Sequence, residues 1–399
     1  MKKVINQWNV LFVFLFLIDG LLRVHVPIGA SIYNVVTFSL LLVMFFAVGR
    51  KDVSKETPFF PFLMPLAFVL VTETQILCLS HVQLRSNFGV LVWILALLFF
   101  SWKNTINTAF YKYTVHLFSL IGAVSALVVV GGLQPLTLAD RSFLLIDKGY
   151  LTLFFALSMC MSFFDVANKK HIKTNAFIFV AIFIVNTFVV SSKTAMVALI
   201  AFVATMFFLS ESRVRKMLAF FLVPILAVYC VLVVLYPEQY ISHSMAVAVN
   251  QVLGDNVLRV DVDKTNLATY ELRALIDARS FEIFLSSPIY GIGMGGFALM
   301  GGVDGILECE NTYMDILVGG GILLGLPLFF MMIFMTILIV KNIKDNVFFY
   351  ENYMALSIML CVIICFRWND FLLPIVFALM GCAFYIAKRT RKMGRADEK

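Results

Sequence analysis

Tyr270–Gly325 reads YELRALIDARSFEIFLSSPIYGIGMGGFALMGGVDGILECENTYMDILVGGGILLG, and it combines charges, glycines and a helical repeat in a chain that is otherwise mostly apolar. Its first part, Tyr270–Leu285, alternates apolar and charged residues at the spacing of an amphipathic helix. The apolar positions are Leu272, Leu275, Ile276, Phe281, Ile283, Phe284 and Leu285. Such a helix suits the membrane interface better than the bilayer core. Pro288 ends it, six glycines follow within twelve positions, and a hydrophobic run begins near Met314.

The composition of the whole chain is that of a polytopic membrane protein. Hydrophobic residues make up 61% of the 399 residues, charged residues only 14%, and the mean hydropathy is +0.95. Soluble domains are less apolar and carry nearly twice as much charge. Apolar runs predict an all-α protein with about twelve transmembrane helices. The expected spans are Trp8–Leu22, Ile28–Val48, Phe59–Leu79, Phe88–Phe100, Thr114–Leu133, Tyr150–Phe164, Asn175–Val190, Thr194–Leu209, Met217–Tyr236, Met314–Val340, Phe348–Phe366 and Phe371–Ala387.

The positions of Lys and Arg predict the orientation of these spans. With the N-terminus in the cytoplasm, 21 of the 31 Lys and Arg fall in inner segments, and every inner segment is basic. This is the asymmetry that the positive-inside rule requires, so the net charge of +7 reflects topology and not a nucleic-acid partner. The expected division is 1–236 with nine spans, 237–313 as a large outer loop, 314–387 with three spans, and 388–399 as a basic cytoplasmic tail.

Several charged residues lie at the outer ends of the expected spans. Arg85 follows the third span, Lys193 lies in the short turn between the seventh and eighth spans, and Arg367 follows the eleventh. Because charge is expensive inside a bilayer, their shared depth predicts a water-filled polar cavity that opens outward beneath the long loop. Each residue also has a simpler interpretation. Lys193 can snorkel to the lipid headgroups, and Arg85 and Arg367 can contact headgroups. Arg273 and Arg279 can lie on the solvated face of a surface helix.

No motif in the sequence calls for a metal or another cofactor. The five histidines form no close cluster, and the Asp261-x-Asp263 pair lacks the glycine and distal glutamate of a calcium loop. The Gly291-x-Gly293-x-Gly295 run follows no strand, so it is no dinucleotide fingerprint. These glycines instead indicate a tight loop that packs closely. The expected cofactor set is therefore empty.

The central stretch resembles the O-antigen polymerase and ligase family (Wzy and WaaL type). That family carries an Arg about fifteen residues before a Pro, a glycine run, then His-Asn-x-Tyr leading into a span with a Gly-Ile-x-Gly-like sequence. Here the same order is Arg273, Ser287-Pro288, Gly291-Ile-Gly293, Glu310-Asn311-Thr312-Tyr313 and Gly321-Ile-Leu-Leu-Gly325. The family's Ser-Arg-x-Ala is similar to Ser192-Lys193-Thr194-Ala195. The motifs cover about seventy residues, and the resemblance implies a GT-C-like membrane fold.

Two positions depart from the family pattern. Glu310 stands where the family has His, and Lys193 stands where it has Arg. A glutamate can still accept a proton, and a lysine keeps the positive charge but loses the bidentate geometry that arginine offers to phosphate.

The resemblance implies a glycosyl transfer from a polyprenyl-pyrophosphate-linked oligosaccharide in the bilayer. An acceptor hydroxyl attacks the anomeric carbon and polyprenyl pyrophosphate leaves, so cations must hold the leaving group and a base must take the hydroxyl proton. The implied catalytic residues are Arg273 and Glu310. The implied substrate-binding residues are Lys193, Arg279, Asn311, Tyr313, Arg85 and Arg367.

The expected protein is therefore a polymerase of oligosaccharide repeat units for O-antigen, capsule or exopolysaccharide, in the bacterial cytoplasmic membrane with its active face outward. Its implied partners are the lipid-linked oligosaccharide, the bilayer, and a flippase and a chain-length regulator of the same pathway. A ligase that transfers glycan to a lipid core or a protein is the first alternative. A lipid-linked glycan flippase or other transporter is the second, although transporters usually show related halves.

The orientation is directly testable. A reporter that is active only outside the cytoplasm should work when fused near Thr265, in the predicted outer loop, and fail when fused near Lys344, in a predicted inner loop. Enzyme activity of the reporter in whole cells measures both fusions. The opposite pattern would reverse the orientation and move the predicted site to the wrong side of the membrane.

Overall fold

The computed structural model shows a protein that is helical in nearly all of its described part. The residues that it describes are 35–37, 39, 92, 94, 96–97, 108–128, 142–143, 146–190, 192–209, 216–217, 220, 224, 264–293, 296–301, 303, 309, 311–345, 349–368 and 374–397. The helices are α6 (Thr108–Val128), α7 (Lys148–Ala167), α8 (Ile172–Val185), the π-helix η4 (Asn186–Val190), α9 (Lys193–Leu209), α12 (Lys264–Ser286), α13 (Gly296–Leu299), α14 (Thr312–Lys344), α15 (Phe349–Trp368) and α16 (Pro374–Asp397). Two short antiparallel strands, β1 (Ser142–Phe143) and β2 (Ile146–Asp147), precede α7. The expected all-α class is therefore confirmed in outline.

The described helices overlap seven of the twelve expected spans. They are α6, α7, α8 with η4, α9, α14, α15 and α16, while the other five spans lie outside the described residues apart from isolated helical positions. Among the described residues, α14 is the one helix long and apolar enough to cross a membrane by length and composition, and five further apolar helices are shorter. The number of spans stays a prediction.

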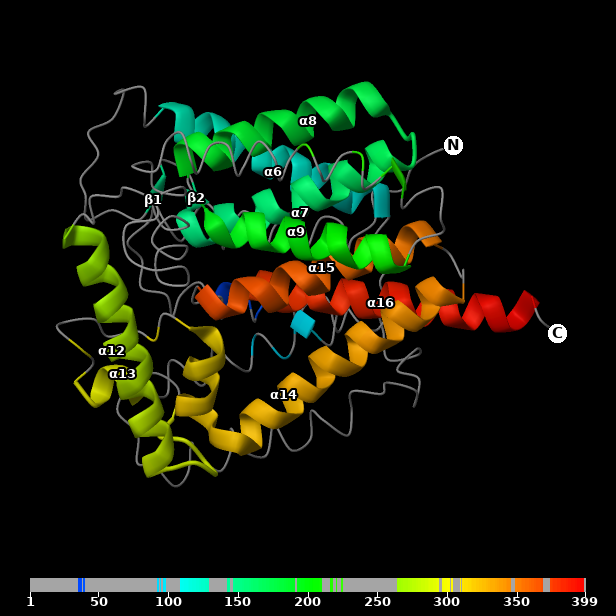
Figure 1. Ribbon diagram of the computed structural model, residues 1–399. Coiled ribbons are helices and arrows are strands. Elements are labelled where there is room, and N and C mark those ends of the chain that lie inside the picture. Colours follow the sequence, from blue (N-terminus) through cyan, green and yellow to red (C-terminus); the bar gives the residue numbers. More distant parts are fainter. Residues whose placement is uncertain are drawn as a thin grey trace.

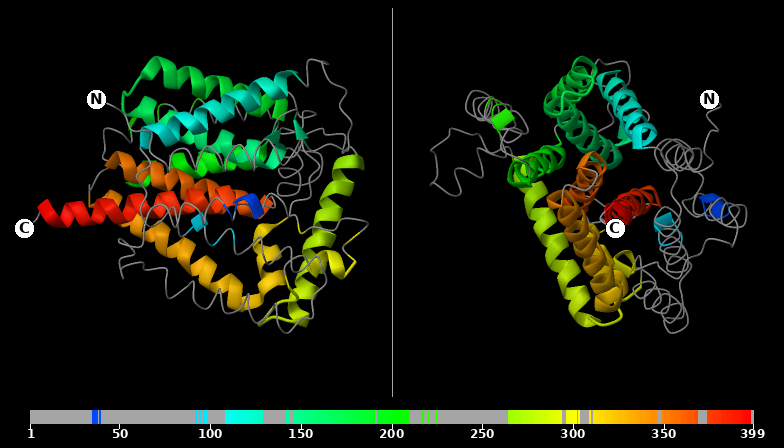
Figure 2. Two further views of the ribbon diagram at one scale, coloured as in Figure 1. Left: turned by 180° about the vertical axis from the view of Figure 1, so that it is seen from behind. Right: turned by 90° about the vertical axis from the view of Figure 1, so that its right-hand side faces the viewer.

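Six of these helices form a bundle. In Figure 1, α6, α7, α8, α9, α15 and α16 run side by side, and the two views of Figure 2 show the same arrangement. The core lies around α7 and α15, where Phe154, Phe155, Tyr353 and Phe366 are fully buried. α7 contacts α6, α8, α9 and α15, which explains why its sequence is apolar on all sides.

The bundle has two chemically different ends. The end at the right of Figure 1 holds the α7–α8 connection and the end of α14. Exposed lysines gather there, and we call it the basic end; they are Lys169, Lys170, Lys173, Lys341 and Lys344. α12 crosses the opposite end, which we call the α12 end (Figures 1 and 2).

α14 is broken near its start. Gly321 has a non-helical backbone, with φ 59° and ψ −160°, and divides a short first segment from a long second one. The second segment, 322–344, rises about 34 Å at 1.5 Å per residue, which is more than the ~30 Å of a bilayer core. The spanning capacity of α14 therefore resides in the part after the break.

The loop after α12 supplies the hydrogen bonds that the break removes. In an unbroken helix, the N–H groups of Ile322 and Leu323 would donate to the carbonyls of Val318 and Gly319. Instead, Ile322 donates to Pro288 O at 2.9 Å and Leu323 donates to Ile289 O at 3.2 Å.

The freed carbonyls are satisfied by the same loop. Val318 O accepts from Ile292 N at 2.9 Å, and Gly319 O accepts from Gly293 N at 2.8 Å. All four groups are thus paired by backbone alone, so the break leaves none of them without a hydrogen-bond partner. The 288–293 loop replaces the missing helical hydrogen bonds of α14, and it thereby connects α12 to α14.

We call the contact between residues 288–293 and the break at 318–323 the junction. Both of these segments require glycine where they meet. Gly291 has φ +73°, and a Cβ on it would overlap the carbonyl of Gly319. Gly321 has φ +59°, and a Cβ on it would overlap the carbonyl of Ile289. The glycine runs that mark this part of the sequence therefore lie against each other, because only glycine allows two backbones to approach so closely in these conformations.

The junction can be tested with a matched pair of glycine substitutions. Gly301 has φ +88°, but a Cβ on it meets nothing within 4 Å, so Gly301→Ala should cost about 1–2 kcal/mol from backbone strain alone. Gly291→Ala adds an overlap with Gly319 and should lower the midpoint of thermal unfolding in detergent further than Gly301→Ala does. Equal midpoints for the two variants would contradict the packing described for Gly291.

Candidate functional site

α12 carries both arginines that the sequence analysis singled out. The helix runs over Lys264–Ser286, so it begins six residues before the predicted amphipathic segment. Its buried face includes Ile276, Ser280 and Ile283, and the two isoleucines pack in a small core with Phe297 and other residues. The side chain of Arg273 is outside the described set, but its position is two helical turns before Ser280, so the two positions share one face of α12.

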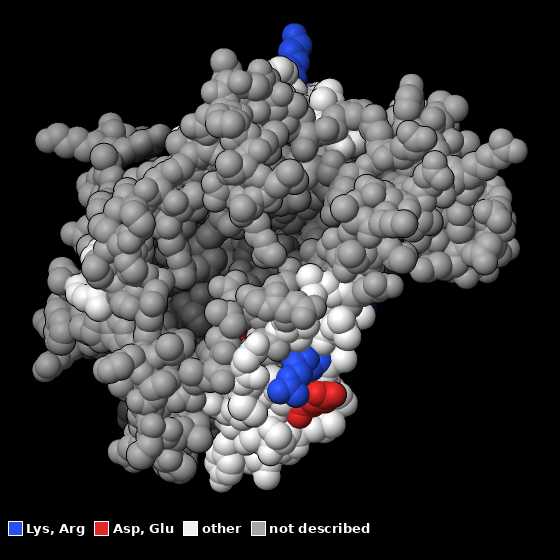
Figure 3. Space-filling model, turned by 90° about the vertical axis from the view of Figure 1, so that its left-hand side faces the viewer, with Lys and Arg blue, Asp and Glu red and all other residues white. Residues whose placement is uncertain are grey.

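Arg279 lies on a different part of the same helix. Its guanidinium donates to Glu282 Oε2 at 3.0 Å, and the two side chains are 41% and 66% exposed. Figure 3 shows the α12 end of the molecule, where a basic and an acidic group lie next to each other among uncharged described residues. An exposed pair of this kind contributes little to stability. Its geometry matches the alternative of a solvated helix face more closely than a binding site.

The residues that flank Glu310 are both buried. Cys309 is 1% exposed, and its Sγ lies 3.4 Å from Ser280 Oγ on α12. Asn311 is 7% exposed and caps α14, because its Oδ1 accepts from Tyr313 N at 3.1 Å. Glu310 itself lies outside the described residues. The chain is therefore fixed to α12 directly before this glutamate and to α14 directly after it.

Tyr313 connects the start of α14 to the last turns of α15. Its hydroxyl donates to Ile363 O at 2.8 Å, and its ring packs against Phe366 with 5.7 Å between ring centroids. Arg367 follows Ile363 by four residues, which is about one helical turn; its side chain is outside the described set. The structure brings Tyr313 and the Arg367 turn together, but the tyrosine hydroxyl is already used by a backbone carbonyl. A role for Tyr313 or Asn311 in substrate binding stays a prediction.

Lys193 begins α9 in a turn that is held by buried polar groups. Asn186 is fully buried in η4, and its Nδ2 donates to Ser192 O at 3.2 Å. Ser192 Oγ in turn accepts from Ala195 N at 3.4 Å and caps α9. The turn lies at the end of the bundle that α12 crosses (Figure 1). The Lys193 side chain and Arg85 lie outside the described set.

A second polar site, at the basic end of the bundle, was missed from the sequence. Lys112 on α6 forms a buried ion pair with Asp165 on α7. Tyr350 on α15 donates its hydroxyl to the other carboxylate oxygen of Asp165 at 2.7 Å. Lys170 Nζ lies 3.3 Å from the centroid of the Tyr350 ring, at a distance typical of a cation–π contact. These four residues form what we call the charge cluster.

Two residues of the charge cluster are recognisable in the sequence as charges next to apolar runs. Asp165 follows the mostly apolar run Leu151–Phe164, and Lys112 lies in the second turn of the preceding helix, α6. The two residues are 53 positions apart in sequence, so no local pattern pairs them. Only helix packing shows that the two are adjacent.

Polar side chains continue from the charge cluster along the α6–α7 interface. His116 Nδ1 lies 2.6 Å from Ser158 Oγ, and Ser119 donates to Phe154 O at 2.9 Å. The buried atoms His116 Nε2 and Ser162 Oγ have no hydrogen-bond partner in the described part of the chain. Buried polar atoms of this kind are uncommon.

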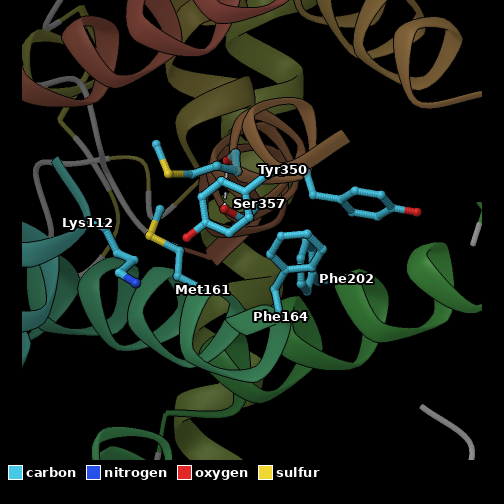
Figure 4. A pocket seen from close by; sticks show the side chains of 8 residues that line it. Lys112, Met161, Phe164, Phe202, Tyr350 and Ser357 are labelled. Atoms are coloured by element: carbon cyan, nitrogen blue, oxygen red, sulfur yellow. Dashed lines mark hydrogen bonds between the residues drawn. The ribbon is translucent and has the colours of Figure 1, made fainter. Parts of the chain in front are cut away.

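The pocket beside the charge cluster is small. It is lined by Lys112, Met161, Phe164, Phe202, Tyr350, Tyr353, Met354 and Ser357, with Lys112 and Tyr350 side by side at one edge (Figure 4). Its empty space is about 210 Å³ including its open mouth, which is below the range of small-molecule sites. It does not hold an oligosaccharide as it stands.

No protein-family model matches the chain, and no curated protein matches it significantly. Over the described residues, no group of three or more His, Cys, Asp and Glu is placed to hold a metal ion; Asp261 and Asp263 lie outside them.

The charge cluster leads to a stability prediction. Asp165→Asn removes the carboxylate and leaves the Lys112 ammonium buried without its counter-ion, which should cost about 3–5 kcal/mol. The double variant Lys112→Met with Asp165→Leu replaces the pair by apolar side chains and should be much closer to the parent. Unfolding in detergent, followed by circular dichroism, measures both.

The exposed pair on α12 is the matched control. Glu282→Gln breaks an ion pair of the same charge type in solvent and should cost less than about 1 kcal/mol. If Asp165→Asn is no more destabilising than Glu282→Gln, the ion pair at the basic end is not buried as described.

Proposed function

We propose that this chain is a membrane glycosyltransferase that polymerises polyprenyl-pyrophosphate-linked oligosaccharide repeat units at the outer face of the bacterial cytoplasmic membrane. In this proposal the chain has twelve spans in a GT-C-like arrangement, with both termini in the cytoplasm and residues 237–313 outside. The products are surface polysaccharides of the O-antigen, capsule or exopolysaccharide type.

The charge distribution supports this orientation. Exposed lysines collect at the end of the bundle opposite α12, and an excess of positive charge favours the cytoplasmic side. In this orientation α12, the 288–293 loop and the start of α14 face outward. A polymerase of repeat units that have crossed the membrane needs its reacting groups on that side.

The single observation that carries the proposal is the junction of the 288–293 loop with the break in α14. The four backbone hydrogen bonds join the segment Pro288–Gly293 to the segment Val318–Leu323. These are two of the segments on which the family resemblance rests. The contact of Cys309 with Ser280 adds a second tie between α12 and the chain that leads to Asn311.

A rigid junction of this kind suits the proposed chemistry. The attacking hydroxyl must lose its proton while the pyrophosphate gains negative charge, so a base and a cation must be held at a fixed separation. In the proposal Arg273 stabilises the leaving pyrophosphate, with Lys193 in support, and Glu310 accepts the proton from the acceptor hydroxyl. The donor bond from the anomeric carbon to the pyrophosphate oxygen breaks as the new glycosidic bond forms. The proposed step needs no metal, because the basic side chains neutralise the phosphate charge.

One observation favours a second candidate, a transporter of lipid-linked glycan. The charge cluster lies at the basic end, away from α12, and ionisable groups buried in membrane helices are typical of transport pathways. A transporter and a polymerase are distinguished by purified protein alone, because only the polymerase lengthens the glycan in detergent. A ligase uses the same donor but transfers it to a different acceptor.

Substitutions at Arg273 and Glu310 test the polymerase. Arg273→Lys keeps the charge but loses the bidentate contact with phosphate, and it should lower turnover by about 10²–10³, as for the loss of one transition-state donor. Glu310→Gln keeps the shape and removes the base, so it should also suppress polymer formation. Glu310→His should retain partial activity, because imidazole can serve as the base. Polymer length on gels, from purified protein with a lipid-linked repeat unit, is the measurement.

Glu282→Gln is the matched control on the same helix. The Glu282 side chain is 66% exposed and has no role in the proposed step, so this variant should remain close to the parent in turnover. Normal ladders from both Arg273→Lys and Glu310→Gln, at equal protein levels, would remove the site assignment.

A further inference from the structure

α12 has a second apolar face, which is exposed. Ile276 and Ile283 are buried against the small core, whereas Leu275, Phe281 and Leu285 are each more than half exposed. At 3.6 residues per turn, Ala274, Ala278, Phe281 and Leu285 fall in a sector of about 60° roughly opposite the buried face. The predicted amphipathic helix therefore divides its apolar residues between two faces, and only one of them packs against the described protein.

This exposed face continues onto the loop that follows α12. Ile289 and Tyr290 are both 54% exposed. Because Leu323 N donates to Ile289 O, the exposed loop lies directly beside the start of the long segment of α14. The apolar surface of α12 therefore does not end at Leu285 but reaches α14.

The long segment of α14 carries an exposed apolar stripe of its own. Leu326, Phe330, Ile333 and Ile337 are exposed along one side of the helix, at the spacing of successive turns. In the described part of the chain, this is the helix long and apolar enough to cross a bilayer, so the stripe is the surface that hydrocarbon would cover.

We propose that the exposed face of α12 lies in the outer leaflet and contacts lipid hydrocarbon, as a lateral extension of the lipid-facing stripe of α14. Two observations favour lipid over water. The face is continuous with the α14 stripe. In addition, each large apolar side chain is stabilised by about 1.5–3 kcal/mol when it is fully transferred from water to an apolar environment. The exposed ion pair of Arg279 and Glu282 adjoins the apolar face, which is the division between apolar and charged surface that an interfacial helix shows.

The position of α12 agrees with this placement. In Figures 1 and 2, α12 crosses the ends of the bundle helices and does not run along them. If those helices are membrane spans, α12 lies along the membrane surface. Resting on the proposed function, this places the Arg273 helix at the depth of lipid phosphates, where the pyrophosphate of a lipid-linked donor is found.

Spin labels at single introduced cysteines test the proposal in proteoliposomes of phosphatidylethanolamine and phosphatidylglycerol. Phe281→Cys and Leu285→Cys should be more accessible to oxygen than to a water-soluble nickel complex, and Ile333→Cys on α14 should show the same preference more strongly. Glu282→Cys, next to Phe281 but on the charged side, should prefer the nickel complex. The five described native cysteines are buried, and the parent protein carried through the same labelling supplies the background.

Each result decides the proposal without any measurement of glycosyl transfer. Nickel accessibility at Phe281→Cys and Leu285→Cys equal to that at Glu282→Cys would place the face in water and overturn the proposal. Low accessibility to both reagents would show that another protein surface, such as a second copy of the chain, covers it, and would overturn the proposal as well. A preference for the nickel complex at Ile333→Cys would show that the exposed stripe of α14 is in water and would contradict the placement of α14 in the bilayer.

Discussion

The reciprocal backbone pairing between the 288–293 loop and the break in α14 is the constraint on which the described structure of the α12 end depends. A helix cannot break in an apolar surrounding unless its freed carbonyls and N–H groups find other partners. Here Pro288, Ile289, Ile292 and Gly293 supply all four. The direction of the first segment of α14, the end of α12 and the approach of the two glycine runs all follow from this exchange.

The junction also explains why side chains contribute so little to it. A Cβ at Gly291 would overlap the backbone of Gly319, and a Cβ at Gly321 would overlap the backbone of Ile289. The contact between the two segments is therefore made by main-chain atoms. Side chains gather instead on either side. Ile276, Ile283 and Phe297 pack beneath α12, and Tyr313 ties the first segment of α14 to α15. α12 is therefore joined to the start of α14, and α14 packs against α15 and α16 of the bundle.

Polar groups are divided between two distant places. Those at the α12 end are backbone junctions, helix caps and candidate binding residues, whereas the charge cluster at the basic end is a buried set of side chains that joins α6, α7 and α15. A buried ion pair stabilises a fold weakly compared with apolar packing, but it is costly to leave half-formed. Removing one member of the charge cluster is therefore expected to cost more than replacing the ion pair by apolar side chains.

The sequence by itself determined the all-α class, the approximate positions of seven described helices and the order of the glycine segments, because apolar runs and glycine positions are local properties of the chain. It also pointed to Arg273, Glu310 and Asn311 through their order along the chain. Only the tertiary structure decided that Cys309 packs on Ser280, that Asp165 meets Lys112 and Tyr350, and that Gly291 lies against Gly319. These partners are separated by 28 to 185 residues, and no local pattern records which distant side chain will lie opposite. The same holds for the two apolar faces of α12: periodicity showed that the helix has apolar residues at regular spacing, but which of them are buried depends on where α13 and α14 pack.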